Sequence, residues 1–346
     1  MLHPVQAACS SVIESSDEFL KAAKEVVLDP NGDDPWVIAC FDIEELYPSI
    51  DQQHLRQQID VTVHSSGIHS YKQRLLVLEM ISIVVQNQQI QHKGECFLAI
   101  LGLATGLAAG VFFANLYLVQ QDIEILKQLI NLNIHCKLYK RYIDDVCMIV
   151  KASSIERIAT IANSWHRNIR WKLAAFGTDA IPFLDMSLSI SSGRVSSKLY
   201  RKPSAIYQYI PAASCHPPSV FTGIAAGETN RILRRCSDSS DARKEIQFLR
   251  RKLEARGHRS FAISKAIAKV VRKLPANKGG SSSPHQNDSK KRKAFCILPW
   301  SSGMRAKWIR KVLLKNSAAI PAVHIMLAYS TQRNTFRKLY KSMWHA

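Results

Sequence analysis

The chain has 346 residues, enough for two or three domains, and 47% of them are hydrophobic, which supports a folded core. Its eight cysteines include no CxxC pair, so neither a disulfide framework nor a cysteine zinc site is visible, and we expect a reducing intracellular compartment. The formal charge of +20 is uneven: residues 1–193 hold 15 Lys and Arg against 21 Asp and Glu, whereas residues 194–346 hold 32 against 6. The acidic half suits metal binding, and the basic half suits phosphates or, alternatively, a membrane surface.

The first 36 residues predict one short amphipathic helix. Its apolar positions include Phe19 and Leu20, Ser16 or Asp17 can cap its start, and Asp-Pro-Asn-Gly at 29–32 ends it. No basic-plus-apolar signal peptide is present at the N-terminus.

A buried strand is predicted at 37–41, where the apolar run VIACF ends in Asp42. A turn or first helical turn follows at 44–49. The next stretch, 51–93, has apolar residues at helical spacing, so we expect helices that pack into a core.

Residues 96–119 contain no charged residue, a length that would suit a transmembrane helix. Gly102, Gly106 and Gly110 even follow the GxxxG spacing of membrane dimers. No second hydrophobic span exists, however, and the segment lies between two carboxylate-bearing motifs. We therefore expect no membrane partner.

Tyr139–Val150 predicts a hairpin of β-branched, aromatic and apolar residues with Asp144 and Asp145 at its tip. Adjacent carboxylates repel each other unless they are solvated or hold a cation, and oxygen ligands suit Mg²⁺. A surface turn is the alternative. If Asp42 lies beside this tip, the three carboxylates can hold two divalent ions for an in-line phosphoryl transfer.

Four ordered motifs resemble the reverse transcriptases of Penelope-like retroelements. FDIEELYPSI (41–50) resembles motif A, GLATGLAAGVFFANLYL (102–118) motif B, RYIDDVCMI (141–149) motif C, and residues 181–219 a later block of that family. The resemblance covers most of residues 15–275. It implies an α+β fold: a right-hand polymerase palm, made of an antiparallel sheet with packed helices, plus a helical thumb-like region.

The resemblance also implies an enzyme, an RNA-directed DNA polymerase that transfers a nucleotide from a dNTP to a primer 3′-hydroxyl. Asp42 and Asp144 would bind two Mg²⁺ ions, which Mn²⁺ can replace, with Asp145 as an auxiliary ligand. The expected partners are dNTPs and an RNA or DNA template with its primer, and no small-molecule cofactor is expected.

Four further residues are expected at the nucleotide. Tyr47 would exclude a ribose 2′-hydroxyl, Gly106 would leave room in a backbone turn, and Asn115 would lie on the helix that this turn opens. Lys172 would follow a helix that starts at Ser153–Ser154 and donate a proton to pyrophosphate. A core tyrosine and a solvated lysine are the alternatives for Tyr47 and Lys172.

A hairpin of two strands is predicted within 181–205, and Arg201 and Lys202 at its end are expected to contact nucleic-acid phosphates, or else to be ordinary exposed cations. We expect five parts in all: a lead-in helix left from the fingers at 1–36, a palm with motifs A, B and C at 37–203, a basic helical thumb-like region at 204–275, a flexible linker at 276–293, and a C-terminal helical extension at 294–346. The basic cluster Lys290–Lys293 favours a nuclear location.

Two departures from the family keep other functions open. Only 41 residues precede Asp42, so most of the fingers would be missing, and Val111 stands where the family usually has Pro. A truncated or inactive remnant that only binds nucleic acid is one alternative. A cyclase-type palm enzyme is another, although the basic thumb-like region disfavours it.

Overall fold

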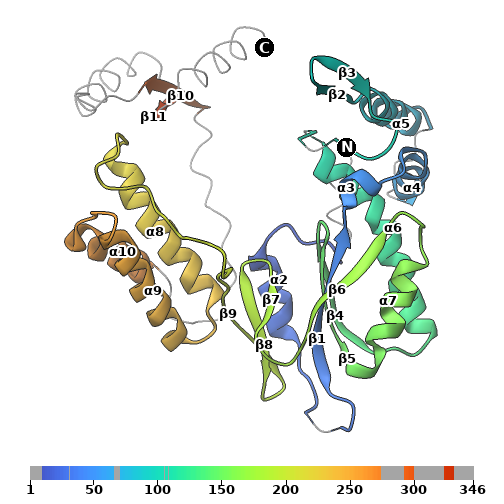
Figure 1. The fold of residues 1–346 in the computed structure, drawn as a ribbon, viewed down its shortest axis with the longest axis horizontal. Helices are drawn as coiled ribbons and strands as arrows, with labels where there is room; N and C mark the ends of the chain where they lie inside the picture. The colour runs from blue at the N-terminus through green and yellow to red at the C-terminus, as the bar shows by residue number, and fades with distance from the viewer. Residues whose placement is uncertain are drawn as a thin grey trace. The chain divides into compact units, whose positions relative to one another are not determined.

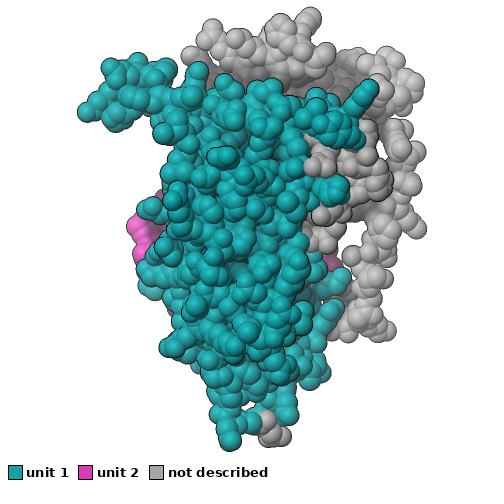
Figure 2. Space-filling view, turned by 90° about the vertical axis from the view of Figure 1, so that its right-hand side faces the viewer, with its two compact units in different colours: residues 1–203, 234–242 teal, residues 204–233, 243–346 magenta. Residues whose placement is uncertain are grey.

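The structure is a computed structural model that describes residues 10–30, 32–65, 71–104, 106–107, 109–273, 292–299 and 323–330. The chain divides into two compact units, shown in different colours in Figure 2. Unit 1 comprises residues 1–203 and 234–242, and unit 2 comprises residues 204–233 and 243–346.

Unit 1 is built on a four-stranded antiparallel sheet whose strands lie in the order β4-β5-β1-β6 (Figure 1). These strands are β4 (Cys136–Tyr142), β5 (Asp145–Lys151), β1 (Trp36–Glu44) and β6 (Arg170–Gly177). β1 lies between β5 and β6, and its apolar run 37–41 is buried throughout. A strand covered on both faces needs such a continuous apolar run, which is why the sequence signal was strong.

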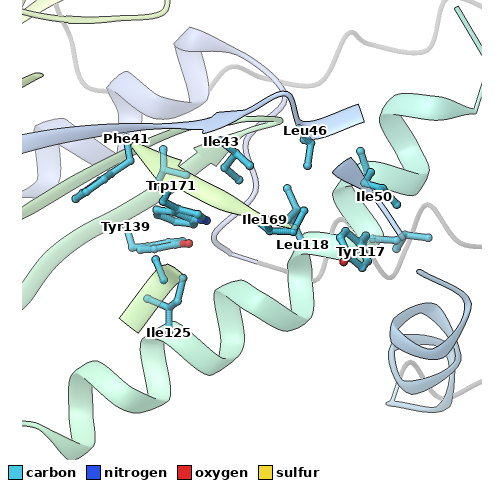
Figure 3. Packing of buried hydrophobic residues seen from close by; sticks show 14 of the residues in the cluster. Phe41, Ile43, Leu46, Ile50, Tyr117, Leu118, Ile125, Tyr139, Ile169 and Trp171 are labelled. Atoms are coloured by element: carbon cyan, nitrogen blue, oxygen red, sulfur yellow. The ribbon is translucent and has the colours of Figure 1, made fainter. Parts of the chain in front are cut away.

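One face of this sheet shares a buried cluster with five helices. Of these, α6 (Gly110–Asn131) and α7 (Ile155–Asn163) lie alongside the strands, whereas α3 (Leu46–Ser49), α4 (Gln52–Ser65) and α5 (Tyr71–Gln86) lie beyond one end of the sheet (Figure 1). Figure 3 shows the packing: the rings of Phe41 and Trp171 are tilted by 53° to each other with 5.7 Å between their centroids, and Ile125 of α6 belongs to the same buried cluster. This cluster is the larger core of unit 1.

The opposite face of the sheet carries α2 (Ser16–Glu25) and a second, three-stranded sheet. Its strands are β7 (Ile181–Phe183), β8 (Met186–Ser191) and β9 (Arg194–Leu199), in that order. Phe19 of α2 meets Phe183 at 4.7 Å between ring centroids. The cap of α2 is Ser15, whose hydroxyl accepts from the backbone N–H of Glu18, and not Ser16 or Asp17 as expected.

One predicted helical stretch ends earlier than the sequence suggested. The helical prediction for 51–93 fails after Gln86, where β2 (Gln89–His92) and β3 (Glu95–Leu98) form a hairpin. Lys93 and Gly94 both have positive φ, a turn geometry that overrides helical spacing. The helix expected to start at Ser153–Ser154 is α7, which begins at Ile155 after the 3₁₀ turn η1 (Ala152–Ser154).

Asn163 explains why α7 stops and β6 begins. Its side-chain oxygen accepts from the N–H of Trp171 at 2.9 Å, and its amide nitrogen donates to the Trp171 carbonyl at 3.1 Å. The predicted caps also differ, because Ser154 makes no capping hydrogen bond and Ser153 donates its N–H and hydroxyl to Asp34.

The uncharged run 96–119 is divided among β3, a glycine-containing loop and the first half of α6. Within the described part of the chain, no helix has the length and apolar character needed to cross a membrane.

Unit 2 contains most of α8 (Pro218–Arg235) and α9 (Ser239–Glu254) and all of α10 (Ser260–Lys273). Ile232, Leu249, Leu253 and Ile263 are its buried apolar contacts. Arg256 and His258, which follow α9, bond to the carbonyls at 209 and 210.

The linker expected at 276–293 lies outside the described residues except at its end. Of the segment 294–346, expected to be helical, the described residues belong to β10 (Arg292–Pro299) and β11 (Val323–Ser330), which pair in parallel.

Candidate active site

Four residues form a row across the central sheet of unit 1. Tyr142 pairs with Asp145, Asp145 with Asp42, and Asp42 with Lys172 in the antiparallel register. Directly opposed residues of antiparallel strands project on the same face, with Cβ atoms roughly 4.5–5.5 Å apart. The register therefore brings two of the predicted carboxylates and the predicted lysine together, from strands far apart in sequence.

Asp144 lies in the two-residue connection between β4 and β5, next to this row. Its carbonyl accepts from the N–H of Ile43 at 3.1 Å, which ties the hairpin tip to β1. Ile143, the other residue of the connection, has φ +57°, a conformation that β-branched residues rarely adopt. The hairpin tip is thus a defined turn and not a free surface loop.

The three carboxyl groups interact with one another. Burial, and then the charges of Asp144 and Asp42, raise the pKa of Asp145 to about 6, against a smaller lowering by Lys202. Burial, followed by the charges of Asp144 and Glu44, also raises the pKa of Asp42, while Lys172 opposes the rise. Such a cluster favours whatever brings positive charge to it, either protons or a cation.

Lys172 is exposed on β6, and its Nζ lies 3.3 Å from Oε1 of Glu44. It also lines an open groove beside the row, together with Thr160, Asn163 and Arg170.

Among the residues that the structure describes, no group of three or more His, Cys, Asp or Glu side chains is arranged to hold a metal ion. The carboxylates nevertheless fit Mg²⁺ in kind. That ion takes oxygen ligands only, usually one or two carboxylates, and completes its shell with water and phosphate oxygens. The pair Asp42 and Asp145, with Asp144 beside it, supplies that number of carboxylates.

Tyr47 lies on α3 between the row and the motif B loop. Burial and the charge of Asp144 raise its pKa, so its phenol lies within electrostatic reach of that carboxylate. A Cβ added at Gly110 would lie 3.7 Å from the Tyr47 ring. The backbone carbonyl of Tyr47 accepts a hydrogen bond from the N–H of Leu103 at 2.8 Å. The ring therefore lies between the two motifs that the resemblance assigns to the nucleotide.

The two other motif B residues differ in setting. Gly106 is exposed with φ +97°, and a Cβ there would meet nothing within 4 Å, so the loop leaves open space at this point. Asn115 is only 4% exposed, and its side-chain oxygen accepts from Nη1 of Arg141 at 2.9 Å. The structure does not bring the Asn115 side chain to the carboxylate row.

Lys202 and Arg201 follow β9. Lys202 is exposed and close enough to lower the pKa of Asp145, whereas Arg201 is partly buried. The structure therefore brings Lys202 toward the carboxylates.

Two ion pairs of unit 1 were missed by sequence reasoning. Arg141 and Asp122 are both buried, with Nη2 and Oδ2 2.8 Å apart. Asp185 accepts from Nε of Arg235 at 2.9 Å and from the hydroxyl of Ser16 at 2.7 Å. In the sequence, such a residue is visible only as a single charge beside an apolar run. That pattern does not show which distant residue it pairs with.

Residues 208–268 match the animal helix-turn-helix domain family. No curated protein sequence matches the chain. Among solved structures, the chain is similar to telomerase from Candida albicans in complex with a fragment of telomeric RNA, with a TM-score of 0.50, 11% identity and coverage of 79% of this chain and 49% of that one.

Two further similar structures have TM-scores below 0.5. They are telomerase from Candida tropicalis (TM-score 0.44, 12% identity, coverage 80% and 48%) and a Sicinivirus RNA-dependent RNA polymerase (TM-score 0.42, 11% identity, coverage 74% and 54%). The chain spans about half the length of these structures.

At this identity, the likeness to the Candida albicans telomerase shows the fold alone. The chain has a polymerase-type fold: an antiparallel palm sheet with packed helices, joined to a helical thumb-like region. The predicted fold class is confirmed.

Proposed function

We propose that the chain is a reverse-transcriptase domain, an RNA-directed DNA polymerase of the Penelope-like retroelement type. The observation that carries this proposal is the cross-strand pair Asp42 and Asp145, with Asp144 in the adjoining turn. The Penelope-like type rests on the sequence motifs, and the polymerase activity rests on the palm fold and on this carboxylate row.

In this proposal the three carboxylates and two nearby lysines have defined tasks. Asp42 and Asp144 would hold two Mg²⁺ ions, with Asp145 beside them. When bound, the ions supply the charge that activates the primer hydroxyl and neutralises the triphosphate. Lys172 donates a proton to the departing pyrophosphate, and Lys202 holds a phosphate of the primer or template.

Nucleic acid is the proposed partner for three reasons. The telomerase that shares the fold is described in complex with RNA, and the matched family is named for a helix-turn-helix, a motif used by DNA-binding proteins. The charge of the C-terminal part, 32 basic against 6 acidic residues, favours a phosphate backbone as ligand. A nuclear location belongs to the same proposal and rests on the basic cluster at 290–293.

The second candidate is an inactive remnant that only binds nucleic acid. Two observations favour it: the Asn115 side chain is committed to Arg141 inside the core, and Val111 replaces the family's proline at an exposed position. The unbroken carboxylate row favours activity instead.

Primer extension tests the choice between these candidates. We expect the full chain to extend a DNA primer on an RNA template with dNTPs and Mg²⁺, and Asp144→Ala/Asp145→Ala to abolish extension while retaining duplex binding. If neither protein extends the primer but both bind the duplex, the remnant is the correct assignment.

Sugar selection tests the proposed role of Tyr47. We expect Tyr47→Ala to incorporate ribonucleotides more readily because the ring no longer excludes the 2′-hydroxyl. Tyr47→Phe keeps the ring and serves as the control. Steady-state incorporation of rNTP against dNTP measures the effect, and an unchanged ratio in Tyr47→Ala would remove this role.

A further inference from the structure

A fully buried guanidinium lies beneath the hairpin that carries Asp144 and Asp145. The Arg141 side chain is 0% exposed. Its Nε donates to both carboxylate oxygens of Asp122 at 3.0 Å, and its Nη2 donates to Oδ2 at 2.8 Å. Its Nη1 donates to the side-chain oxygen of Asn115 at 2.9 Å and to the carbonyl of Ile143 at 3.0 Å. The Arg141 side chain therefore joins α6 to the turn at Ile143 and Asp144.

The acceptor of this guanidinium is itself fixed from two other directions. Asp122 accepts from the hydroxyl of Tyr139 at 2.7 Å and from the hydroxyl of Ser11 at 3.0 Å. The backbone segment at 11–13 lies along β4 as a parallel bridge, with Arg141 N–H donating to the Ser11 carbonyl and Ile13 N–H donating to the Arg141 carbonyl. Asp122 cannot move without disturbing α6, β4 and this segment together.

The turn that Arg141 reaches has an unusual backbone. The φ of Ile143, +57°, persists in a β-branched residue only where the surroundings impose it. The bond from Arg141 to the Ile143 carbonyl is such a constraint. The next carbonyl along the chain, that of Asp144, accepts from Ile43 and so sets the turn against β1.

We infer that Arg141 is a positioning residue for the carboxylate row: anchored on Asp122, it fixes the Ile143 carbonyl and thereby the placement of Asp144 and Asp145 beside Asp42. The segment at 11–13 belongs to the same support. This inference rests on the proposed function only in taking those carboxylates as the working groups.

The test separates positioning from stability. Arg141→Met alone would leave the Asp122 carboxylate buried without its counter-charge. If that protein failed to fold, the unpaired charge would explain the failure, and the role of Arg141 in the turn would not be tested. Replacing a buried ion pair by well-packed apolar residues of similar size is often neutral for stability. The variant is therefore Arg141→Met/Asp122→Leu/Tyr139→Phe in the full chain. The matched control is Arg235→Met/Asp185→Leu, which removes the contacts of Arg235 with Asp185 and Asp17 elsewhere in unit 1, while Asp17 keeps its ion pair with Arg234.

Two readouts are measured on the folded proteins. Amide hydrogen exchange at Ile43, whose N–H bonds to Asp144, reports the turn without any metal or activity. Titration with Mn²⁺ by electron paramagnetic resonance reports the carboxylate row. In the triple variant we expect faster amide exchange at Ile43 than in wild type, with protection kept at Cys40 and Met148. We also expect its Mn²⁺ affinity to be 10- to 100-fold weaker, which is the usual effect of losing a group that supports a metal ligand.

A second variant covers the case in which the triple variant unfolds. Arg141→Lys keeps a charge for Asp122, but a single ammonium cannot also bond to Asn115 and Ile143 in the manner of a guanidinium. In Arg141→Lys we also expect faster exchange at Ile43 and a weaker Mn²⁺ affinity. Unchanged exchange at Ile43 in a folded variant would overturn the inference.

Failure of the proposed function looks different. A wild-type chain that neither extends a primer nor binds Mn²⁺ would contradict the polymerase assignment, while exchange at Ile43 would still decide whether Arg141 positions the turn. The control variant is expected to match wild type in both readouts.

Discussion

At the scale of single residues, the Asp145 carboxyl is subject to two opposing requirements. Catalysis as proposed needs it ionised beside Asp42 and Asp144, whereas burial and those two charges favour its protonated form and raise its pKa to about 6. An acid with a raised folded-state pKa destabilises the fold once it ionises. The site therefore lowers the stability of the metal-free protein at neutral pH.

Removal of this charge should stabilise the metal-free protein. For Asp145→Asn we expect a gain of about 1 kcal/mol in the free energy of unfolding at pH 7, because the folded-state pKa lies above the model-peptide value and solvent around this half-buried group screens part of the effect. The sign follows from the direction of the shift: the penalty is absent below pH 4, grows as pH rises through 6, and is complete above it. Urea unfolding in EDTA at pH 4 and pH 7 measures the difference.

Asp179 provides a control of opposite sign. The hydroxyl of Ser189 donates to its carboxylate and lowers its pKa, so Asp179→Asn should lose stability at neutral pH and not at low pH. An equal gain from Asp145→Asn at both pH values would contradict the electrostatic origin.

At the scale of elements, the motif B loop is locked onto α3. Gly102 has φ +77°, and its N–H donates to the Ile50 carbonyl at 2.8 Å. A Cβ at this position would lie 2.8 Å from the Cα of Pro48 and 2.9 Å from the Tyr47 carbonyl oxygen. Both are backbone atoms, so neither can rotate away. This close approach, rather than a membrane-dimer pattern, accounts for glycine at 102.

A substitution at Gly102 should therefore cost more than backbone strain alone. We expect Gly102→Ala to destabilise unit 1 by about 2–4 kcal/mol, the sum of a left-handed backbone and overpacking. Gly94→Ala is the matched control, because Gly94 has φ +87° with nothing within 4 Å of an added Cβ. Urea unfolding of the two variants isolates the clash, and equal losses would show that α3 moves to accommodate it.

At the scale of the whole molecule, the charge asymmetry is concentrated on particular helix faces. The buried residues of α10 are Ile263 and Ala266, and its exposed face carries Phe261, Lys265 and Lys269 at intervals of four residues. A stripe of cations with an aromatic ring at one end suits a duplex, whose phosphates attract the lysines. We expect this face to contribute to nucleic-acid affinity.

The salt dependence of binding tests this expectation. Lys265→Gln/Lys269→Gln should reduce the slope of log K against log salt by about 2, because each lysine that neutralises a phosphate contributes about one unit to that slope. Lys93→Gln/Lys127→Gln removes two exposed cations of unit 1 and is the control. Fluorescence anisotropy with an RNA–DNA hybrid at several KCl concentrations measures both slopes, and equal reductions would mean that the attraction is generic.

The sequence predicted those features whose signal is local. The apolar run before Asp42 and the hairpin around Asp144 are encoded by their own residues, and the two together sufficed to place carboxylates at one sheet. The hairpin 89–98 was missed because its turn residues, Lys93 and Gly94, follow a long helical pattern without interruption.

Partners that meet across long distances were not predictable in the same way. Asn115 was expected at the nucleotide from its motif alone, yet its neighbour in space is Arg141, and no periodicity links the two. Lys172 was expected after a helix and does follow α7, but its place opposite Asp42 on the edge strand β6 was not predicted. Register, unlike strand identity, is decided by tertiary packing.

The strand order of the central sheet has a consequence for how the protein is made. β1 pairs with β5 and β6, which follow it by more than a hundred residues, so the carboxylate row contains no local contact between its two acidic strands. Closing such long loops before any pairing is gained is slow, and the isolated early chain exposes an apolar strand with two free edges. During synthesis, the strand that carries Asp42 remains unpaired until β5 and β6 have left the ribosome. The site is then completed in one step of sheet closure, and a nascent chain that stops before β5 contains motif A without its partner carboxylates.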